Sequence, residues 1–532
     1  MRYILPKKVI KEQSVSNSEV LLKSTLNQAT LSSNEVCTIK KGGYIILDFG
    51  KEIHGGLDIT VQMTGDDSGK MHVTFGESVS ESMSTIGFKN ATNNHAIRDM
   101  IVDVPFMSNF NIGKTGFRFV KIEVLNSEIQ FRTILADFMV KDIEYKGSFK
   151  CSDELINDIW NTGAYTVYLN MHDYLWDGIK RDRLVWVGDM HPEVSIISAV
   201  FGYDDCVPKS LDLIKSETLP SDWINGIPAY SMWWIKIQRD WYYQNGDFEY
   251  LKEQEEYLLA TLEHIIKNIN DDGTNNIDYK FVDWCSNETP AAEAGLHAMF
   301  KIALIAGAEI CEILGNNNFA NVCKSKLKAL DNYSPDNFNN KQIAGLEIFA
   351  DSRALEKNMK NVLKPKPLEG LSTFLGFYVL KAYGEAKDIS GALEILRGYW
   401  GGMLEMGATT FWEDFDINWM ENAYKIDELP KDGMNDVHGD NGRFCYEGFR
   451  HSLCHGWAGG PTAFLSQYVL GVHVLAPGCK KIMITPNIGD LKWAEGSYPT
   501  PYGNINISHK LVDGKLKTTV DAPSEIEIVR GK

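Results

Sequence analysis

The spacing of apolar residues changes twice along this chain of 532 residues, and that change limits the folds it can adopt. Up to about residue 145 apolar and polar residues alternate, as in Leu57 to Met63, which predicts strands with one face on a core and the other in water. From Leu155 the apolar residues recur at i, i+3, i+4 and i+7, the spacing of a core-facing helix. After about residue 472 short β runs return. The sequence therefore predicts a β–α–β order.

We expect an antiparallel β-sandwich over residues 1–147, an all-α domain over 148–472 and a β region over 473–532. Gly55-Gly56 is predicted to separate two strands, and Ser152 to be the N-cap of the first central helix. No strong internal repeat occurs, which favours one large α domain over a solenoid. Further helices are predicted at about 192–202, 229–244, 248–269, 290–314, 317–331, 350–362, 371–384, 388–399 and 459–470.

Composition excludes several classes of protein. Apolar residues make up 44% and charged residues 23%, so the chain is not mainly disordered. The formal net charge is −18 and no basic stripe occurs, so we expect no nucleic-acid partner. The nine cysteines include no CxxC pair, so neither a disulfide framework nor a zinc knuckle is expected.

The location expected from the sequence is cytoplasmic, and a periplasmic one stays open. Lys7, Lys8 and Lys11 stand where a signal peptide would need its apolar stretch. No apolar run reaches the 18 residues of a membrane span, so no membrane association is expected.

The densest polar cluster runs from Asp177 to Asp189 and is followed by Glu193. Trp186 lies within the cluster and implies partial burial, where charges must pair or shift their pKa values. Asp182, between Arg181 and another arginine, is the candidate for a functional carboxylate. A solvated charged loop is the alternative interpretation.

A second cluster spans Gly407 to Asp416. Glu413 follows Trp412, and a carboxylate in such a low-dielectric pocket is a candidate general base of raised pKa. Acidic residues in the first turn of a helix would give the same pattern, so that alternative stays open.

Two further motifs carry polar side chains beside aromatic ones. Asp283 precedes Trp284, where a simple loop aspartate is the alternative. His451 and His455 have the i, i+4 spacing of metal ligands, but no HExxH glutamate lies between them and no dedicated carboxylate is evident. We therefore expect no metal site.

Two separate carboxylate clusters in a Trp-rich helical domain favour glycoside hydrolysis, which needs an acid for the leaving oxygen and a base or nucleophile on the other side of the ring. The chain has no GxSxG motif, no Walker loop and no GxGxxG between a strand and a helix. Serine-hydrolase, P-loop and Rossmann enzymes are therefore disfavoured.

These clusters resemble the family-78 α-L-rhamnosidases, over most of the chain. The segment Asp177 to Asp189 is similar to the family's catalytic loop, D-C-P-x-R-D-E-R-L-G-W-T-G-D. Thr409 to Glu413 is similar to the T-T-x-W-E of its general base, and Ser452 to His455 to its S-x-x-H. Asp283-Trp284 resembles its G-D-W, with Val282 in place of glycine. Four other motifs resemble its terminal sandwich domains: Leu47–Gly50, Gly55–Leu57, Phe75–Glu77 and Pro499–Gly503.

The resemblance implies an (α/α)6 barrel, a small C-terminal β-sandwich and inverting hydrolysis. Asp182 stands seven residues before Asp189, where the family has its general-acid glutamate, in a loop one residue shorter that lacks Cys-Pro. If the loop is aligned with the family motif from Asp177 instead, the family's general-acid glutamate has no counterpart in this chain. We therefore align the loop from its Asp189 end, where the match needs no gap. By resemblance Asp182 is the acid and Glu413 the base.

The other expected site residues bind the sugar. Sugar hydroxyls are expected to bind Asp177, Asp189, Asp283 and His455, and the apolar walls are expected to be Trp186, Trp284 and Trp412. Two cations, Arg181 and Arg183, are expected to keep neighbouring carboxylates ionised or, if the sugar is acidic, to hold its carboxylate.

The expected activity is the exo-acting release of a terminal α-L-rhamnosyl or related sugar, with a carbohydrate as the partner and no cofactor. A homodimer is left open. Two other classes also stay open: an unsaturated-uronyl hydrolase or polysaccharide lyase on a similar barrel, and a catalytically silent carbohydrate-binding protein.

Overall fold

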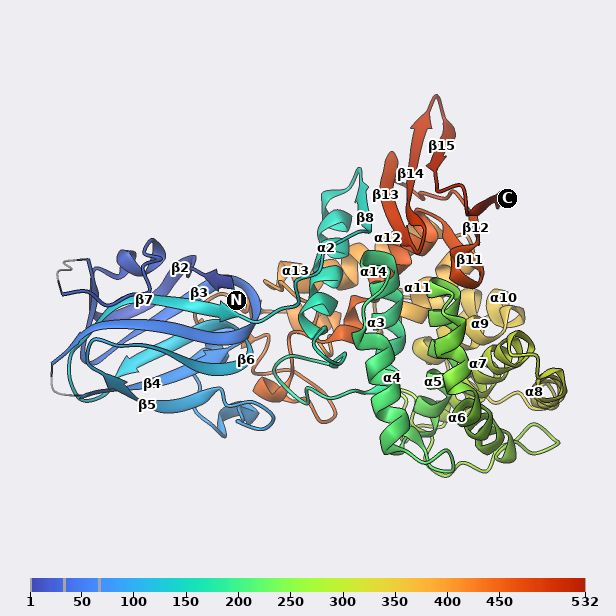
Figure 1. The fold of residues 1–532 in the computed structure, drawn as a ribbon, viewed down its shortest axis with the longest axis horizontal. Helices are drawn as coiled ribbons and strands as arrows, with labels where there is room; N and C mark the ends of the chain where they lie inside the picture. Colours follow the sequence, from blue (N-terminus) through green and yellow to red (C-terminus); the bar gives the residue numbers. More distant parts are fainter. Residues whose placement is uncertain (1, 32–34, 66–67, 532) are drawn as a thin grey trace.

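The computed structural model describes residues 2–31, 35–65 and 68–531. An N-terminal β part lies at one end of the molecule, beside a central helical part, and a C-terminal β part packs onto the helices (Figure 1). The β–α–β order predicted from the apolar spacing is confirmed.

The N-terminal part is a seven-stranded sheet of order β1-β7-β3-β6-β4-β5, with β2 added on β3. The long strand β3 bends back on itself, because Cys37 and Val61 near its two ends both pair with Phe131 of β7. This folding of one sheet encloses a separate apolar core. The strands are β1 Arg2–Ile4, β2 Lys8–Ser16, β3 Cys37–Thr64, β4 Ser68–Gly76, β5 Asp99–Pro105, β6 Asn109–Val124 and β7 Ile129–Phe138.

Two predictions for this part are wrong. Gly55-Gly56 does not separate strands but lies inside β3, where the pairing with β6 shifts register. A Cβ on Gly56 would lie 2.3 Å from the carbonyl oxygen of Gly113, so glycine is needed for the close approach of the strands rather than for a turn.

The polar face of β3 is also not in water. Asp58 and Gln62 are buried, whereas Met63 is 46% exposed. Asn109 donates to Asp58 at 3.0 Å, and Arg132 donates to Gln62 at 3.3 Å. Apolar and polar side chains of β3 do alternate between the two faces of the sheet. The polar face, however, is a buried layer of hydrogen-bonded side chains rather than a face in water.

The central part is a closed ring of inner helices. Along the chain α3 packs on α5, α5 on α7, α7 on α9, α9 on α11 and α11 on α14, and α14 packs back on α3. This closure is the (α/α)6 barrel. The helices are α2 Glu154–Asn170, α3 Val187–Val200, α4 Cys206–Glu217, α5 Pro228–Asn245, α6 Phe248–Lys267, α7 Ala291–Ile313, α8 Asn317–Leu330, α9 Lys341–Ala350, α10 Leu355–Asn358, α11 Gly376–Glu385, α12 Ile389–Ile395, α13 Gly401–Glu405 and α14 Gly460–Phe464.

Most predicted helices are confirmed to within a few residues, but no predicted range covers α4, α9 or α13. Asp153, not Ser152, is the N-cap of α2, since its carboxylate accepts from the amide of Leu155 at 3.0 Å. The Ser152 hydroxyl instead accepts from the amide of Lys492 at 2.9 Å.

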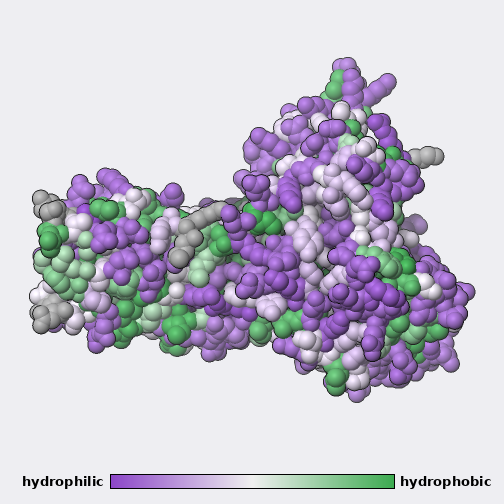
Figure 2. Space-filling model, in the orientation of Figure 1, coloured by the Kyte–Doolittle hydropathy of each residue, from purple (hydrophilic) through white to green (hydrophobic). Residues whose placement is uncertain are grey.

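Helix α7 is long and apolar enough by composition to cross a membrane, alone among the helices of the described ranges. Its most apolar window is 83% buried inside the fold, where it packs on α5, α8 and α9. The face of the helical part in Figure 2 is mainly hydrophilic. The apolar length of α7 is thus accounted for by the core of the barrel.

The C-terminal part holds two sheets, β11-β12-β16 and β15-β14-β13-β8. Its fourth strand, β8, comes from the segment just before α2, so the predicted boundary at residue 148 falls at a strand of the C-terminal sheet. The domain limits themselves stay a prediction. The strands are β8 Ser148–Cys151, β11 Val472–Ala476, β12 Lys481–Ile484, β13 Trp493–Thr500, β14 Gly503–Val512, β15 Lys515–Asp521 and β16 Glu527–Arg530.

Candidate active site

A cavity of about 100 Å³ lies where the inner helices of the ring begin. Its walls come from the segments preceding α3, α5, α7 and α14 or from their first turns, together with the segment around Glu413. The lining residues are Asp177, Arg181, Asp182, Trp186, Asp189, Ile227, Tyr230, Tyr279, Phe281, Trp284, Glu413, Cys445, Tyr446, His455 and Trp457.

Eight of the ten site residues predicted from the sequence line this one cavity, and Asp283 and Trp412 do not. Asp283 is buried behind Trp284, where it accepts hydrogen bonds from the Ser372 hydroxyl at 2.8 Å and from the Trp284 amide at 2.7 Å. Burial raises the pKa of Asp283 to about 6, against the opposing effect of the Ser372 hydrogen bond. Asp283 therefore supports Trp284 from behind.

Trp412 is a correction to the expected apolar walls. It is 1% exposed, and its ring meets Phe415 and His451 edge-on inside the core. Aromatic walls come instead from residues that the sequence patterns did not single out: Tyr230, Tyr279, Phe281, Tyr446 and Trp457. Tyr279 and Phe281 stand just before Asp283, and Trp457 just after His455, whereas Tyr230 and Tyr446 lie in segments without a predicted site residue.

The loop from Asp177 to Leu184 is closed by its own first side chain. The Asp177 carboxylate accepts from the amide of Leu184 at 2.9 Å, and the Asp177 amide donates to the carbonyl of Leu184 at 3.1 Å. Inside this closure Asp182 and Arg183 have left-handed backbones, with φ of 52° and 59°. Such conformations cost about 1–3 kcal/mol each and persist only where surrounding contacts impose them.

Arg181 connects the two carboxylates proposed for catalysis. Its Nη1 donates to Asp182 at 2.8 Å, and its Nη2 pairs with Glu413. Asp182 also accepts from the indole of Trp186 at 3.2 Å. Arg181 and Glu413 are almost completely buried, which makes this a charge-assisted pair in a low dielectric. The structure thus brings together two clusters that lie far apart in the sequence.

Arg183 does not share this role. Its guanidinium donates to the Lys114 carbonyl at 3.2 Å and lies over the ring of Trp176. Of the two arginines flanking Asp182, only Arg181 reaches the candidate catalytic carboxylates within the part of the chain that the structure describes.

Glu413 is held from both sides. Its Oε2 accepts from the amide of Ser452 at 3.2 Å, and its own amide donates to the carbonyl of Ser452 at 3.0 Å. Burial alone would raise the pKa of Glu413, but Arg181 and His455 more than offset burial, so the pKa lies below its ordinary value. The raised pKa expected from the neighbourhood of Trp412 is therefore wrong, and Glu413 is ionised at neutral pH.

His455 lies between two acids. Its Nε2 is 2.9 Å from Asp189 and its Nδ1 is 3.7 Å from the Oε1 of Glu413. Burial opposes the charge on His455, but Glu413 and Asp189 raise its pKa to about 9. An imidazolium here at neutral pH donates to Asp189 and adds positive charge beside Glu413.

The pKa of Asp177 is shifted in the opposite direction to that of Glu413. Burial, with Asp189 and Asp182 nearby, raises the pKa of Asp177 well above its ordinary value against the effect of His455. The Asp177 carboxyl therefore holds its proton to a higher pH than an ordinary aspartate, whereas Glu413 loses its proton more readily than an ordinary glutamate. Carboxyl groups with opposite shifts around one cavity are the arrangement that acid–base chemistry uses.

Glu193 belongs to the same cluster but lies just behind the cavity. It is 1% exposed, and both of its carboxyl oxygens are buried without a hydrogen-bond partner in the described structure. Burial, then Asp189 and Asp177, raise its pKa well above the ordinary range. Its carboxyl packs on Gly456, where a Cβ would lie 1.6 Å from a Glu193 oxygen.

Within the described ranges, Glu77, Glu81 and His438 form the one group whose ligand atoms could surround a metal ion, all lying within 4.8 Å of one another. The Lys180 ammonium is 2.8 Å from Glu77 and 3.3 Å from Glu81. A cation of the protein itself thus balances these carboxylates.

Comparison with known families matches three models along the chain. Residues 6–142 match the glycosyl hydrolase family 78 alpha-rhamnosidase N-terminal domain, residues 144–335 the bacterial alpha-L-rhamnosidase 6 hairpin glycosidase domain, and residues 471–529 the bacterial alpha-L-rhamnosidase C-terminal domain. The three matches follow the β–α–β order of the fold.

A similar relative is an alpha-L-rhamnosidase of Formosa agariphila, 22% identical over 480 residues, which cover 77% of this chain and 46% of that protein. The chain thus spans about half the length of this curated relative.

Two solved structures share the fold. The family 78 rhamnosidase of Bacillus sp. GL1 superposes with a TM-score of 0.76 at 22% identity, over 96% of this chain and 55% of that one. A rhamnosidase from Klebsiella oxytoca with rhamnose bound gives 0.67 at 18% identity, over 88% and 95%. Because these three consecutive family models together cover most of its length, the chain belongs to glycoside hydrolase family 78, the family of the bacterial alpha-L-rhamnosidases that the models describe.

Proposed function

We propose that the protein is an inverting, exo-acting glycoside hydrolase that releases a terminal α-L-rhamnosyl or closely related neutral sugar. The observation that carries the proposal is the pair Asp182 and Glu413, which come from separate segments and face one aromatic-lined cavity. In this mechanism Asp182 protonates the glycosidic oxygen, and Glu413 takes a proton from the water that attacks the anomeric carbon from the opposite face.

The shape of the cavity supports exo action. A space of about 100 Å³ walled by Trp186, Trp284 and Tyr446 suits one terminal ring better than a continuous chain. Aromatic faces match the apolar faces of a sugar, and the carboxyl groups supply acceptors for its hydroxyls. The rhamnosidase from Klebsiella oxytoca, which has this fold, has rhamnose bound.

The charges favour a neutral sugar over an acidic one. The cations among the lining residues, Arg181 and His455, are already bonded to Asp182, Glu413 and Asp189. A substrate carboxylate would have to displace one of these pairs, which disfavours an unsaturated-uronyl hydrolase or a lyase. The second candidate is a catalytically silent carbohydrate-binding protein, because Arg181 holds both carboxylates and the acid is an aspartate, one methylene shorter than the family's glutamate.

A panel of nitrophenyl glycosides that includes α-L-rhamnoside and uronides tests the proposal, with the anomer of the first product followed by NMR. We expect turnover of the rhamnoside with inversion. A retained configuration contradicts the inverting mechanism. Binding of rhamnose without turnover of any glycoside favours the silent protein, and turnover restricted to substrates with an ultraviolet-absorbing double bond favours the uronyl enzyme.

A further inference from the structure

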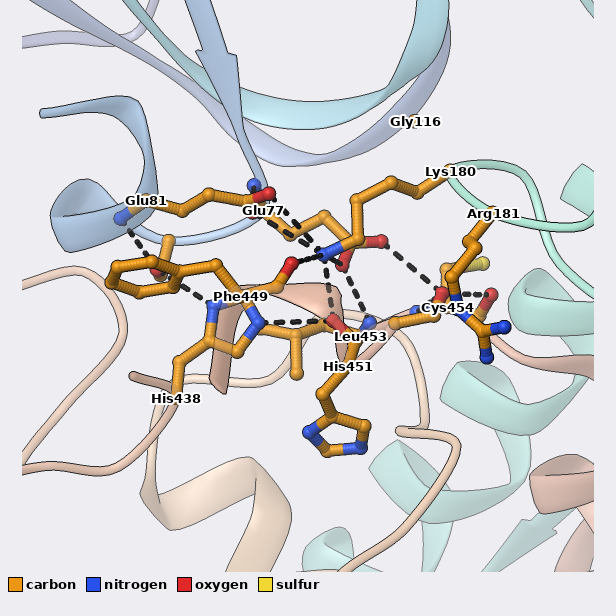
Figure 3. A network of polar contacts seen from close by, with 12 residues as sticks. Glu77, Glu81, Gly116, Lys180, Arg181, His438, Phe449, His451, Leu453 and Cys454 are labelled. Atoms are coloured by element: carbon orange, nitrogen blue, oxygen red, sulfur yellow. Dashed lines mark hydrogen bonds and ion pairs between the residues drawn. The ribbon is translucent and has the colours of Figure 1, made fainter. Parts of the chain in front are cut away.

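Lys180, in the same loop as the candidate acid, does not line the cavity but reaches a buried cluster that contains Glu77 and Glu81 of the N-terminal β part (Figure 3). Its ammonium lies 2.8 Å from Glu77 and 3.3 Å from Glu81, and it donates to the carbonyls of Phe449 at 3.0 Å and His451 at 2.6 Å. Both carboxylates are fully buried. The Lys180 side chain therefore connects the β part to the segment 449–451.

Glu77 also reaches the backbone beside the candidate base. Its Oε2 accepts from the amide of Leu453 at 2.6 Å. The preceding residue, Ser452, exchanges two hydrogen bonds with Glu413, one from its amide to the carboxylate and one from the Glu413 amide to its carbonyl. Glu77 thus holds both sides of the Arg181–Glu413 pair, through Lys180 on one side and Leu453 on the other.

Its neighbour Glu81 shares the Lys180 ammonium, at 3.3 Å, but its other contacts are local. Glu81 accepts from the amide of Glu77 at 2.8 Å and faces Arg98 at 3.6 Å, both within the β part. Among the described contacts, Glu77 alone of the two also bonds the backbone beside Glu413, at Leu453. A buried carboxylate is stable only while such donors remain in place, so the contacts of Glu77 fix the relative positions of the two segments.

We infer that Glu77 of the N-terminal β part is a positioning residue of the active site, which fixes the catalytic loop against Ser452 so that Arg181 and Asp182 meet Glu413. The inference deepens the proposed function, because its rate measurement rests on the proposed hydrolysis. It also makes the β part a structural component of the catalytic machinery rather than an appended module.

The test compares Glu77→Gln and Glu77→Asp with the wild-type chain. The amide of Gln cannot balance the Lys180 ammonium, so we expect kcat to fall about 10- to 100-fold with KM changed much less, as for a misplacement of reacting groups by about 1 Å. Asp keeps the charge and should restore part of the rate. Asp99→Asn breaks an ion pair of the same β part, 2.6 Å from His72, and should leave kcat unchanged.

Hydrogen exchange gives a second measurement that needs no turnover. In Glu77→Gln, peptides covering 177–189 and 448–456 should exchange faster, while β6 and β7 should not change. Unchanged exchange in these peptides, or an unchanged kcat, overturns the inference. If the wild-type chain turns over no glycoside, the proposed function fails and exchange alone decides. If Glu77→Gln does not fold, a wild-type kcat in Glu77→Asp overturns the inference.

Discussion

Asp182 and Glu413 bind different nitrogens of one guanidinium, that of Arg181. A planar fork with two occupied nitrogens sets both the distance and the relative orientation of the carboxylates it joins. The same contact stabilises Glu413 as an anion, the form that a general base requires.

Glu413→Gln should lower kcat by about 10²- to 10⁴-fold on every substrate, because an amide cannot take a proton from water. Sugar binding should persist, since the side-chain volume hardly changes. Steady-state rates and rhamnose titration by calorimetry measure the two effects. Asp416→Asn, three residues along the chain and paired with Arg443, is the matched control and should keep its rate. A Gln variant with more than a tenth of the wild-type rate would exclude Glu413 as the base.

Asp182→Asn should depend on the leaving group. A natural alcohol needs a proton to leave, whereas nitrophenolate does not, so we expect a loss of about 10²-fold or more on a natural glycoside and a much smaller one on a nitrophenyl glycoside. Asp177→Asn is the informative comparison, because burial raises the pKa of Asp177 well above its ordinary value, the direction that a general acid needs. If Asp177→Asn shows the leaving-group dependence and Asp182→Asn does not, the acid is Asp177.

Arg181→Gln should shift the acidic limb of the pH profile. In the wild-type chain Arg181 lowers the pKa of Glu413, so kcat/KM should hold as pH falls and decline only below the ordinary glutamate range of about 4.3. Without the guanidinium, burial dominates and the limb should move to higher pH. Arg353→Gln, on an exposed side chain, serves as control. An unmoved limb in Arg181→Gln would show that another group controls it.

Glu193→Gln should stabilise the fold, and more so at higher pH. Because the pKa of Glu193 is raised in the folded chain, the folded state keeps a proton that the unfolded chain releases above about pH 4.3. The stability of the wild-type chain therefore falls as pH rises above that value, by up to about 1.4 kcal/mol per pH unit. Gln lacks this titration.

Urea unfolding of both chains at pH 5 and pH 8 measures this difference. The advantage of the Gln variant should be larger at pH 8, and an equal difference at both pH values contradicts a buried neutral Glu193. Gly456→Ala should have the opposite effect and destabilise the fold at either pH, because a methyl group would overlap the Glu193 carboxyl.

The layout of the fold could be predicted from the sequence, because apolar spacing reports on each helix and strand separately. The period of two near Leu57 and the helical period from Leu155 sufficed for the β–α–β order. Closure of the ring could not be derived this way. It depends on contacts between helices that are not consecutive in the chain, such as α3 with α5 and α14 with α3, and no local period encodes them.

The candidate site was predictable only in part, because sequence patterns report on each segment separately. Asp182 and Glu413 stand out within their own segments, but their meeting through Arg181 was expected only from the family resemblance. Trp412 was expected to line the cavity because it precedes Glu413, but an aromatic neighbour of a site residue can face the core instead. Glu77 was expected only as part of the Phe75–Glu77 motif of the N-terminal sandwich, because a single carboxylate at the end of a strand does not by itself indicate a role at a site in another part of the chain.

The pairing of β8 with β13 has a consequence for synthesis of the chain. Ser148 and Ser497, hydrogen-bonded across this sheet, are 349 residues apart. A ribosome therefore delivers β8 long before its partner exists, and α14, which completes the ring, also emerges late. Until then the strand is an open edge that foreign chains can join. The pairing of β8 with β13 therefore makes assembly of the barrel a largely post-translational event. Assembly is slow because the contacts are distant in sequence, and it depends on protection of the nascent chain.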